Sequence, residues 1–473
     1  MRTSHVLIVL SLLVPMLAGI THAQDIKKVW ETTDGIQRPE SAYYDAQRDQ
    51  IYVSSIAGGG TEKNGNGWIS ILGTDGTVIE KKWVDGLNAP KGIRSTGDTL
   101  WVSDIDRLLG FDQETGEKVA DVKIPEAKFL NDVAVGYDGT VYVSDMKGNR
   151  IYSYKQGGKL KVFAEGEKLE SPNGLLVSGT RLLVCGFSAG NNKPGHLYSI
   201  DLRNGKKRLV HEKPLGNLDG LELDGRGNYV VTDWPAGKIY RVGPDGQKET
   251  LFSGKKGTAD IGFARDHQIL LLPYMTKDKV VAYQIGPVHD YQNLIDKSLS
   301  KWQTNGNWTV RDDGVVELKP GPNEEGWKRF EDYLTSKTKY DDFVLHVDYK
   351  IIEDGNSGIF FNIGNPEKPV STGIEVQILD SFETTGDLSH HDNGGIISTN
   401  GASKNMSRPA GLWNHMTVIV EGDHLRVILN GEQVQDLQLD ETEVSDRPSS
   451  GHISIQDHGL PFWVRNVKIR SLN

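Results

Sequence analysis

One pattern recurs six times in the first half of the chain: a loop, a polar residue, an apolar strand, a Gly or Asp turn and a second strand. The stretch "FLNDVAVGYDGTVYVSDM" is one copy. The five intervals between the aligned polar residues average about 44 residues, a period typical of a four-stranded propeller blade. The repeat therefore predicts a six-bladed β-propeller over residues 25–286, with the aligned residues around one end of its channel. These residues are Glu40, Lys91, Asn131, Asn173, Asp219 and Asp260.

The second half of the chain lacks this repeat. Stretches such as "DDFVLHVDYKII" and "TGIEVQILD" alternate apolar and polar residues, and Gly, Asn and Asp turns separate them. Little of this half has helical periodicity, so the pattern predicts an antiparallel β-sandwich over residues 290–473. A length of 473 residues agrees with more than one domain. The expected fold class is all-β throughout.

The N-terminal stretch "MRTSHVLIVLSLLVPMLAGITHAQD" has a base, a short apolar run and small residues before a cleavage site. This order predicts a signal peptide over residues 1–23, cleaved near Ala23, and an exported protein, periplasmic or extracellular. A membrane anchor is the less favoured alternative because the run is shorter than a typical span. No other segment is long and apolar enough to cross a bilayer.

The charge of the chain argues against some partners. Its formal net charge is -11, and the signal peptide carries one base and no acid. An acidic exported protein has no electrostatic reason to bind nucleic acid or an anionic membrane surface.

Acid, amide and imidazole groups share the polar face of several strands in the second half. In "TGIEVQILD" Glu375 and Gln377 oppose apolar residues, and in "ISIQDHG" Gln456 and His458 do so. A hydrated outer sheet is the alternative for any single strand. Together these groups suit the binding of paired sugar hydroxyls and the exchange of protons. Five tryptophans could also stack on sugar rings, although core packing is the more usual role: Trp68, Trp234, Trp327, Trp413 and Trp463.

The ordered stretches "YDDFVLHVDYKI", "GNSGIFFNI", "TGIEVQILDS", "GLWNHMTVIVEGDHLRVILNGEQV" and "ISIQDHGLPFWVRNVKI" together resemble the 3-keto-disaccharide hydrolase domain. That family has a concanavalin-like sandwich of the jelly-roll type, and the resemblance covers nearly all of residues 290–473. It implies cleavage of sugars already oxidised at C3. A ketone there acidifies the C2 hydrogen, so a base can remove it, the C1 substituent can leave and water can add.

This chemistry assigns expected roles to the polar face. Glu375 or His458 is the expected base, and His391 in "SHHDNGG" is the expected acid. A turn-stabilising hydrogen-bond cluster is the alternative for Asp457, His458 and Arg465. The expected role of Arg465 is to neutralise Asp457 or the enolate. The residues expected to hold the substrate are Asn356, Gln377, Gln456, Asp457 and Arg465.

The first half resembles the six-bladed propellers of the regucalcin and gluconolactonase superfamily. The resemblance implies a calcium or magnesium ion at the channel mouth, because hard cations prefer oxygen ligands and can polarise a lactone carbonyl. Ser41 replaces the family's glycine, and the Lys91 ammonium could take the place of the metal. The implied metal ligands are Glu40 in "RPES", Asn131 in "LNDV", Asn173 in "PNGL" and Asp219 in "LDGL".

The resulting hypothesis is an exported carbohydrate-active enzyme whose sandwich cleaves 3-keto-glycosides, with a small molecule or oligosaccharide as substrate. The alternative is a non-catalytic carbohydrate-binding sandwich beside a metal-binding, lactonase-like or scaffolding propeller. Ordinary glycoside hydrolysis is less favoured, because the nearest carboxylate pair, Glu375 and Asp380, would point to opposite faces of a strand. The sequence leaves open the oligomeric state and whether the domains share a substrate.

Overall fold

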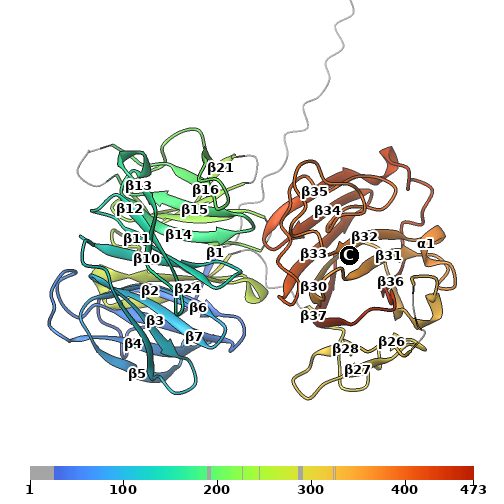
Figure 1. Ribbon diagram of the computed structural model, residues 1–473, viewed down its shortest axis with the longest axis horizontal. Coiled ribbons are helices and arrows are strands. Elements are labelled where there is room, and N and C mark those ends of the chain that lie inside the picture. The colour runs from blue at the N-terminus through green and yellow to red at the C-terminus, as the bar shows by residue number, and fades with distance from the viewer. Residues whose placement is uncertain are drawn as a thin grey trace, which may run out of the picture.

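The computed structural model describes residues 26–188, 193–225, 227–243, 246–285, 291–322, 324 and 326–472. The predicted signal peptide lies outside the described residues. None of the described helices is long and apolar enough to span a membrane. Nearly all of the regular secondary structure in the described chain is strand, which confirms the predicted all-β fold (Figure 1).

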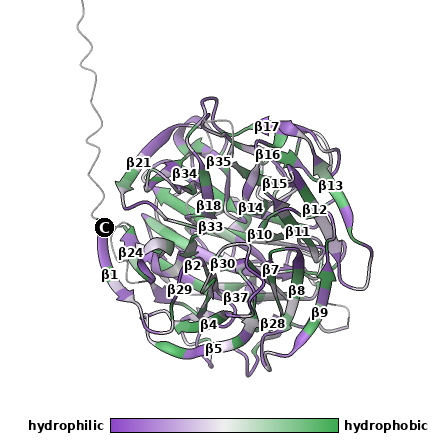
Figure 2. Ribbon diagram, turned by 90° about the vertical axis from the view of Figure 1, so that its left-hand side faces the viewer, coloured by the Kyte–Doolittle hydropathy of each residue, from purple (hydrophilic) through white to green (hydrophobic). Residues whose placement is uncertain are grey.

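Six four-stranded antiparallel sheets form the first half of the chain. Figure 2 shows them around a centre, with β5, β9, β13, β17, β21 and β1 on the rim. The first three sheets are β2 (Pro39–Asp45), β3 (Gln50–Ser55), β4 (Gly67–Gly73) and β5 (Val78–Leu87); β6 (Pro90–Thr96), β7 (Thr99–Asp104), β8 (Arg107–Asp112) and β9 (Lys118–Lys123); and β10 (Leu130–Val135), β11 (Thr140–Asp145), β12 (Arg150–Lys155) and β13 (Lys161–Glu165).

The sixth sheet closes the ring. Its outer strand is β1, the first described strand, which pairs antiparallel with β24 from Ile26 opposite Ile285 to Thr32 opposite Val280. The two ends of the propeller thus share one sheet, and the last blade is completed by the first strand. The remaining sheets are β14 (Pro172–Ser178), β15 (Arg181–Gly186), β16 (Leu197–Asp201) and β17 (Lys207–Leu209); β18 (Leu218–Leu223), β19 (Tyr229–Asp233), β20 (Lys238–Val242) and β21 (Lys248–Ser253); and β22 (Gly262–Ala264), β23 (Ile269–Tyr274), β24 (Lys279–Ile285) and β1 (Ile26–Thr32).

Two further sheets pack face to face in the second half, and their apolar faces form one continuous core. The larger is β27 (Trp308–Val310), β28 (Val316–Leu318), β37 (Phe462–Ser471), β30 (Phe343–Ile351), β33 (Asn414–Glu421), β34 (His424–Leu429) and β35 (Glu432–Gln438), with β25 (Gln292–Asn293) paired to β37. The smaller is β26 (Trp302–Gln303), β29 (Leu334–Tyr340), β36 (Gly451–Ile455), β31 (Asn356–Ile363) and β32 (Ile374–Leu379). The short helices are α1 (Pro369–Thr372), η1 (Glu167–Leu169), η2 (Arg265–His267), η3 (Met275–Lys277), η4 (Phe330–Asp332) and η5 (Leu439–Glu441).

The larger sheet packs on the propeller, and the smaller sheet lies on the far side of the sandwich (Figure 1). The contact includes the hairpin between β34 and β35. Its two-residue turn, Asn430 and Gly431, has positive φ angles of 52° and 89°, the geometry that an Asn-Gly turn adopts most readily. A Cβ on Gly431 would lie 2.6 Å from Leu223 in the propeller, so glycine also permits the close approach of the two domains.

Candidate active site

The candidate site lies on the outer face of the smaller sheet. Glu375 of β32 stands opposite Phe360 of β31, and Phe360 in turn stands opposite Ser454 of β36. Because side chains alternate along a strand, these residues point away from the core while Val376 and Ile455 point into it. The polar faces predicted for the separate strands are therefore one continuous surface.

A cavity of about 320 Å³ opens on this surface, and we call it the Glu375 cavity. Six of the eight residues predicted for the sandwich site line it together. The complete lining is Trp327, Asn356, Val370, Glu375, Gln377, His391, Ile397, Gln456 and His458.

Glu375 lies deep in this cavity, with only 8% of its surface exposed. Burial raises the pKa of its carboxyl from 4.5 to about 8. The adjacent strand makes room for the carboxylate, because a Cβ on Gly358 would lie 2.2 Å from Glu375 Oε1. Glycine at position 358 is thus required for the carboxylate to rest over β31.

Three amides and one phenol lie around the carboxyl. Gln377 Nε2 donates to Asn356 Oδ1 at 3.1 Å, and Gln456 Nε2 donates to the Tyr333 hydroxyl at 3.0 Å. Tyr333 in turn donates to the carbonyl oxygen of Trp327 at 2.7 Å. Gln456 Oε1 is buried and has no partner among the described residues. An unpaired buried acceptor beside a cavity is suited to a hydroxyl of a bound ligand.

Two histidines lie at the cavity. His458 is half-buried, and burial lowers the pKa of its imidazole. The imidazole is therefore neutral near neutral pH and can accept a proton. His391 is exposed, and its ring centroid lies 4.1 Å from that of His390. An exposed imidazole can exchange its proton with solvent between turnovers.

The predicted role of Arg465 is wrong. Arg465 lies on β37 in the larger sheet, where its Nε is 3.4 Å from Asp348, so it cannot neutralise an enolate in the Glu375 cavity. Asp457 instead contacts Arg329 at 3.4 Å and accepts a hydrogen bond from the Gly459 amide at 2.8 Å. The chain crosses from one sheet to the other between β36 and β37, which separates these two residues.

Asp457 does not line the cavity, and its surroundings agree with the alternative of a turn-stabilising cluster. It is fully buried, and burial raises the pKa of its carboxyl. Arg329 and Tyr333 are the residues that the sequence analysis missed. They belong to an irregular segment around η4, where no alternation marks which side chains face the sheet.

A second candidate site lies at the mouth of the propeller. Five of the six aligned residues of the repeat line one cavity of about 180 Å³, which we call the ring cavity. Asp260, the sixth, does not line it. Its carboxylate accepts a hydrogen bond from Ser41 at 2.6 Å and contacts Arg94 at 3.4 Å. The ring residues are Glu40, Lys91, Asn131, Asn173 and Asp219.

The repeat explains how the ring residues are held. In five blades the pairing between the inner strand and the second strand is interrupted at two residues, the ring residue and the one after it. In three blades a hydroxyl on the second strand accepts a hydrogen bond from a backbone amide that the irregularity leaves unpaired. The Ser54 hydroxyl accepts from the Ser41 amide, Ser144 from Asp132 and Thr232 from Gly220, at 2.8–2.9 Å. Each irregularity leaves the ring side chain free to point at the channel.

The ring cavity is rich in buried charge. Burial, together with the nearby Asp219, raises the pKa of Glu40, and burial lowers the pKa of Lys91 to about 8. Lys91 Nζ donates to the Ala89 carbonyl at 3.0 Å. Glu40 Oε2 and Asn173 Oδ1 are buried without a hydrogen-bond partner among the described residues.

These oxygens are donors of the kind that a hard cation prefers. Within the described part of the chain, however, no three His, Cys, Asp or Glu side chains are grouped as a metal site. The ring therefore offers two carboxylates, two amides and one ammonium, and a cation bound there would have Lys91 as its competitor.

Two family models match the chain. Residues 39–255 match an SMP-30/gluconolactonase/LRE-like region, and residues 290–470 match a 3-keto-alpha-glucoside-1,2-lyase-like domain. The order of the two matches is the one expected from the sequence. No curated protein matches the chain.

Solved structures resemble each half. One from Parabacteroides distasonis, assigned as a glycosyl hydrolase, is 25% identical and covers 39% of this chain and 100% of its own, with a TM-score of 0.34. A virginiamycin B lyase from Staphylococcus aureus is 14% identical and covers 55% of this chain and 99% of its own, with a TM-score of 0.40.

Proposed function

We propose that this chain, which joins a gluconolactonase-like propeller to a 3-keto-glucoside lyase-like sandwich, is an enzyme that cleaves 3-keto-glycosides in the Glu375 cavity. The observation that carries the proposal is Glu375 itself: a buried carboxyl with a pKa of about 8, among amides that can hold sugar hydroxyls. A general base is most effective when its pKa lies near the working pH.

In the proposed reaction Glu375 takes the proton from C2 of the sugar, and the C2–H electron pair becomes the enolate of the C3 ketone. The pair then forms a C1–C2 double bond as the C1–O bond breaks. His391 gives a proton to the departing oxygen. Water next adds its hydroxyl to C1 and gives its other proton to His391, C2 regains a proton from Glu375, and the sum is hydrolysis.

We assign the base role to Glu375 rather than His458, because a lowered pKa makes the imidazole the weaker base. The amide groups have the complementary role. Gln377, Asn356 and Gln456 would bind the hydroxyls and the oxygen on which negative charge develops.

The first experiment is incubation of the purified protein with a 3-keto-glucoside and with its unoxidised parent, following release of the aglycone. Release from the keto substrate alone is the expected result. Binding of sugar without release from either would favour the alternative, a non-catalytic carbohydrate-binding sandwich.

For the ring cavity we propose calcium or magnesium binding by Glu40, Asn131, Asn173 and Asp219. The supporting observation is the pair of buried, unpartnered oxygens on Glu40 and Asn173. Such an ion would polarise a lactone carbonyl or a bound water. Calorimetric titration of chelator-treated protein tests this proposal, with Lys91→Met as the comparison: removal of the competing ammonium should tighten binding of the ion.

We also propose that the protein is exported, because the N-terminal stretch has the composition of a signal peptide. N-terminal sequencing of the mature protein tests this proposal. A mature chain beginning at Gln24 is expected.

A further inference from the structure

A second and larger cavity, of about 600 Å³, lies beside the Glu375 cavity on the smaller sheet. We call it the edge cavity, because its floor includes Gln303 of β26 and Thr335 of β29, the two strands at one end of the sheet. The Glu375 cavity lies over the other three strands, β36, β31 and β32. Both volumes are within the range of roughly 300 to 1,000 Å³ that small-molecule sites commonly have.

A single row of aromatic rings separates the two cavities. The ring centroids of Trp327 and Phe330 are 5.9 Å apart, those of Phe330 and Tyr333 are 5.8 Å apart, and those of Tyr333 and Phe360 are also 5.8 Å apart. Trp327 lines the Glu375 cavity, whereas Phe330 and Tyr333 line the edge cavity. The Tyr333 hydroxyl accepts the hydrogen bond from Gln456, so the partition is one side chain thick.

One other segment, around the start of α1, also lines both cavities. Glu367 borders the edge cavity, and Val370, three residues later on α1, borders the Glu375 cavity. Trp327 is 37% exposed, which is unusual for a tryptophan in a folded protein. An exposed aromatic face between two polar hollows is a suitable surface for a sugar ring.

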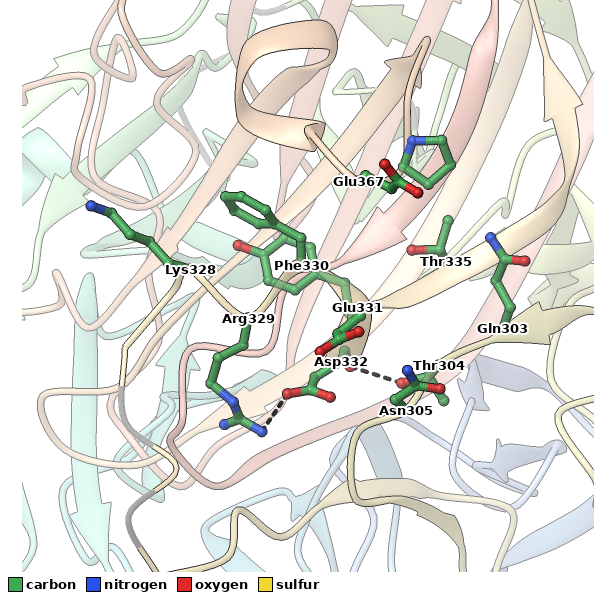
Figure 3. A pocket seen from close by; sticks show the side chains of 12 residues that line it. Gln303, Thr304, Asn305, Lys328, Arg329, Phe330, Glu331, Asp332, Thr335 and Glu367 are labelled. Atoms are coloured by element: carbon green, nitrogen blue, oxygen red, sulfur yellow. Dashed lines mark hydrogen bonds and ion pairs between the residues drawn. The ribbon is translucent and has the colours of Figure 1, made fainter.

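The lining of the edge cavity is polar, and its three carboxylates, on Glu331, Asp332 and Glu367, outnumber its two cations, Lys328 and Arg329. Figure 3 shows Gln303, Asn305, Thr335 and Glu367 around the hollow, with the Phe330 ring at its side. The Arg329 guanidinium is already occupied by Asp332 at 2.8 Å. Amides donate hydrogen bonds to hydroxyls and accept them from hydroxyls, whereas carboxylates only accept hydrogen bonds and repel an anion. This chemistry suits a neutral, hydroxyl-rich ligand.

We infer that the edge cavity binds additional sugar units of an oligosaccharide whose 3-keto unit occupies the Glu375 cavity. This inference rests on the proposed function, since it names the substrate of the same face. A glycan crossing the aromatic row would place consecutive sugar rings in the two hollows. The enzyme would then prefer oligosaccharides over glycosides with a small aglycone.

The first test is binding and does not depend on cleavage. Glucose, maltose, maltotriose, cellobiose and cellotriose are titrated into the full chain by calorimetry. We expect at least one trisaccharide to bind about tenfold more tightly than glucose, because several further hydrogen bonds form in the edge cavity. Equal affinity for glucose and both trisaccharides, or binding of none of these sugars, would overturn the inference.

The second test uses the triple variant Gln303→Ala, Asn305→Ala and Glu367→Ala, whose three side chains are exposed. It should abolish the preference for the trisaccharide over glucose. The matched control is Gln438→Ala with Glu443→Ala, two exposed residues that line neither cavity. A triple variant that keeps the length preference would overturn the inference.

Kinetics separate this inference from the proposed function. For 3-keto derivatives of a trisaccharide and of a methyl glucoside, the triple variant should lower the long-to-short ratio of kcat/KM about tenfold. If no keto sugar is cleaved, the proposed function fails while the binding tests still decide the inference. If both keto sugars are cleaved and the ratio does not change, the inference fails alone.

Discussion

The position of the Glu375 carboxylate depends on the absence of a side chain at Gly358 on the neighbouring strand. Gly358 leaves the space in which the carboxylate lies, and the surrounding side chains bury that carboxylate deeply enough to raise its pKa to about 8. A carboxyl in water would be a weak base near neutral pH, whereas this one is a strong base that is still partly ionised. One glycine and one buried acid on neighbouring strands thus set the proton affinity of the site.

The pH dependence of cleavage follows from this pKa. With proton abstraction from C2 as the slow step, Glu375 must be ionised, so kcat/KM for a 3-keto-glucoside should rise with pH and level off above about 8. Glu375→Gln should lower kcat by a factor of roughly a hundred to ten thousand and leave sugar binding largely intact. A rate that does not change with pH between about 5 and about 9 would contradict the assignment.

The same pKa makes a prediction about stability. The folded-state pKa of Glu375 is raised from 4.5 to about 8, so its stabilising effect is complete below pH 4.5 and is lost as pH rises towards 8. The loss should approach about 1.4 kcal/mol per pH unit, and burial of 92% limits solvent screening. Glu375→Gln removes the ionisation, so the variant should become progressively more stable than the wild type over this range. Chemical denaturation at several pH values measures the difference; a constant difference would argue against a raised pKa.

Space at position 358 gives a third test of the site. In Gly358→Ala the new methyl group would overlap Glu375 Oε1, so the carboxylate must move or the strands must separate. We expect a loss of activity of about a hundredfold, because small displacements of a catalytic group are costly. Sugar binding to the amides should be affected less. Activity equal to that of the wild type would show that the carboxylate position is not critical.

At the scale of elements, alternation predicted the parts of the site that lie on regular strands. Glu375, Gln377 and Gln456 lie where a period of two places them, because one face of each strand is fixed by the core. Arg465 follows the same alternation, but periodicity does not state which sheet a strand joins, and β37 pairs with β28 and β30. The contributions of Arg329 and Tyr333 come from an irregular segment and required the three-dimensional structure.

The sequence repeat of the propeller predicted most of the ring residues but not the position of every side chain. It aligned the ring residues because five blades repeat the same ladder irregularity, and three of them also repeat the supporting hydroxyl on the second strand. It also aligned Asp260, which instead makes a buried ion pair with Arg94. The repeat predicted the blade and the strand end at which Asp260 lies. It did not predict that the Asp260 side chain contacts Arg94 rather than the ring cavity.

The closing strand permits a prediction for the propeller. A chain that begins at Thr33 lacks β1 and leaves β24 as an exposed edge. At roughly 1 kcal/mol for each lost backbone hydrogen bond, we expect a loss on the order of 5 kcal/mol and a Tm lower by roughly 10 to 20 °C. Scanning calorimetry measures this, with a chain beginning at Ile26 as the control. Equal Tm values for the two chains would mean that β1 does not close the ring.

At the scale of the whole molecule, the two candidate sites face away from each other. Asn173 of the ring cavity is near the start of β14, and Ser178, at the end of that strand, contacts the sandwich. The Glu375 cavity lies on the smaller sheet, beyond the larger sheet that packs on the propeller. A single small substrate therefore cannot contact both sites, and the two domains would act on separate molecules or on distant parts of one glycan.

What joins the domains is a buried carboxylate. Glu432, at the start of β35, is fully buried, and it accepts hydrogen bonds from the Tyr229 and Ser178 hydroxyls of the propeller. Arg181 of the propeller lies 2.7 Å from it, and Lys404 of the sandwich lies 3.1 Å from it. Two cations and two hydroxyls from different segments thus converge on one side chain.

Removal of this carboxylate should weaken the joint between the domains. Glu432→Ala leaves Arg181 without its partner, and because the arginine side chain is 27% exposed, water compensates for part of the loss. We expect a destabilisation of about 2 to 3 kcal/mol, below the full cost of breaking a buried ion pair. Cleavage in the Glu375 cavity should persist, since that cavity lies on the other sheet. Scanning calorimetry of the full chain checks the first point and aglycone release the second, with Glu443→Ala as a surface control. If Glu432→Ala unfolds like this control, the carboxylate does not hold the domains together, and their packing must depend on apolar contacts such as that between Gly431 and Leu223.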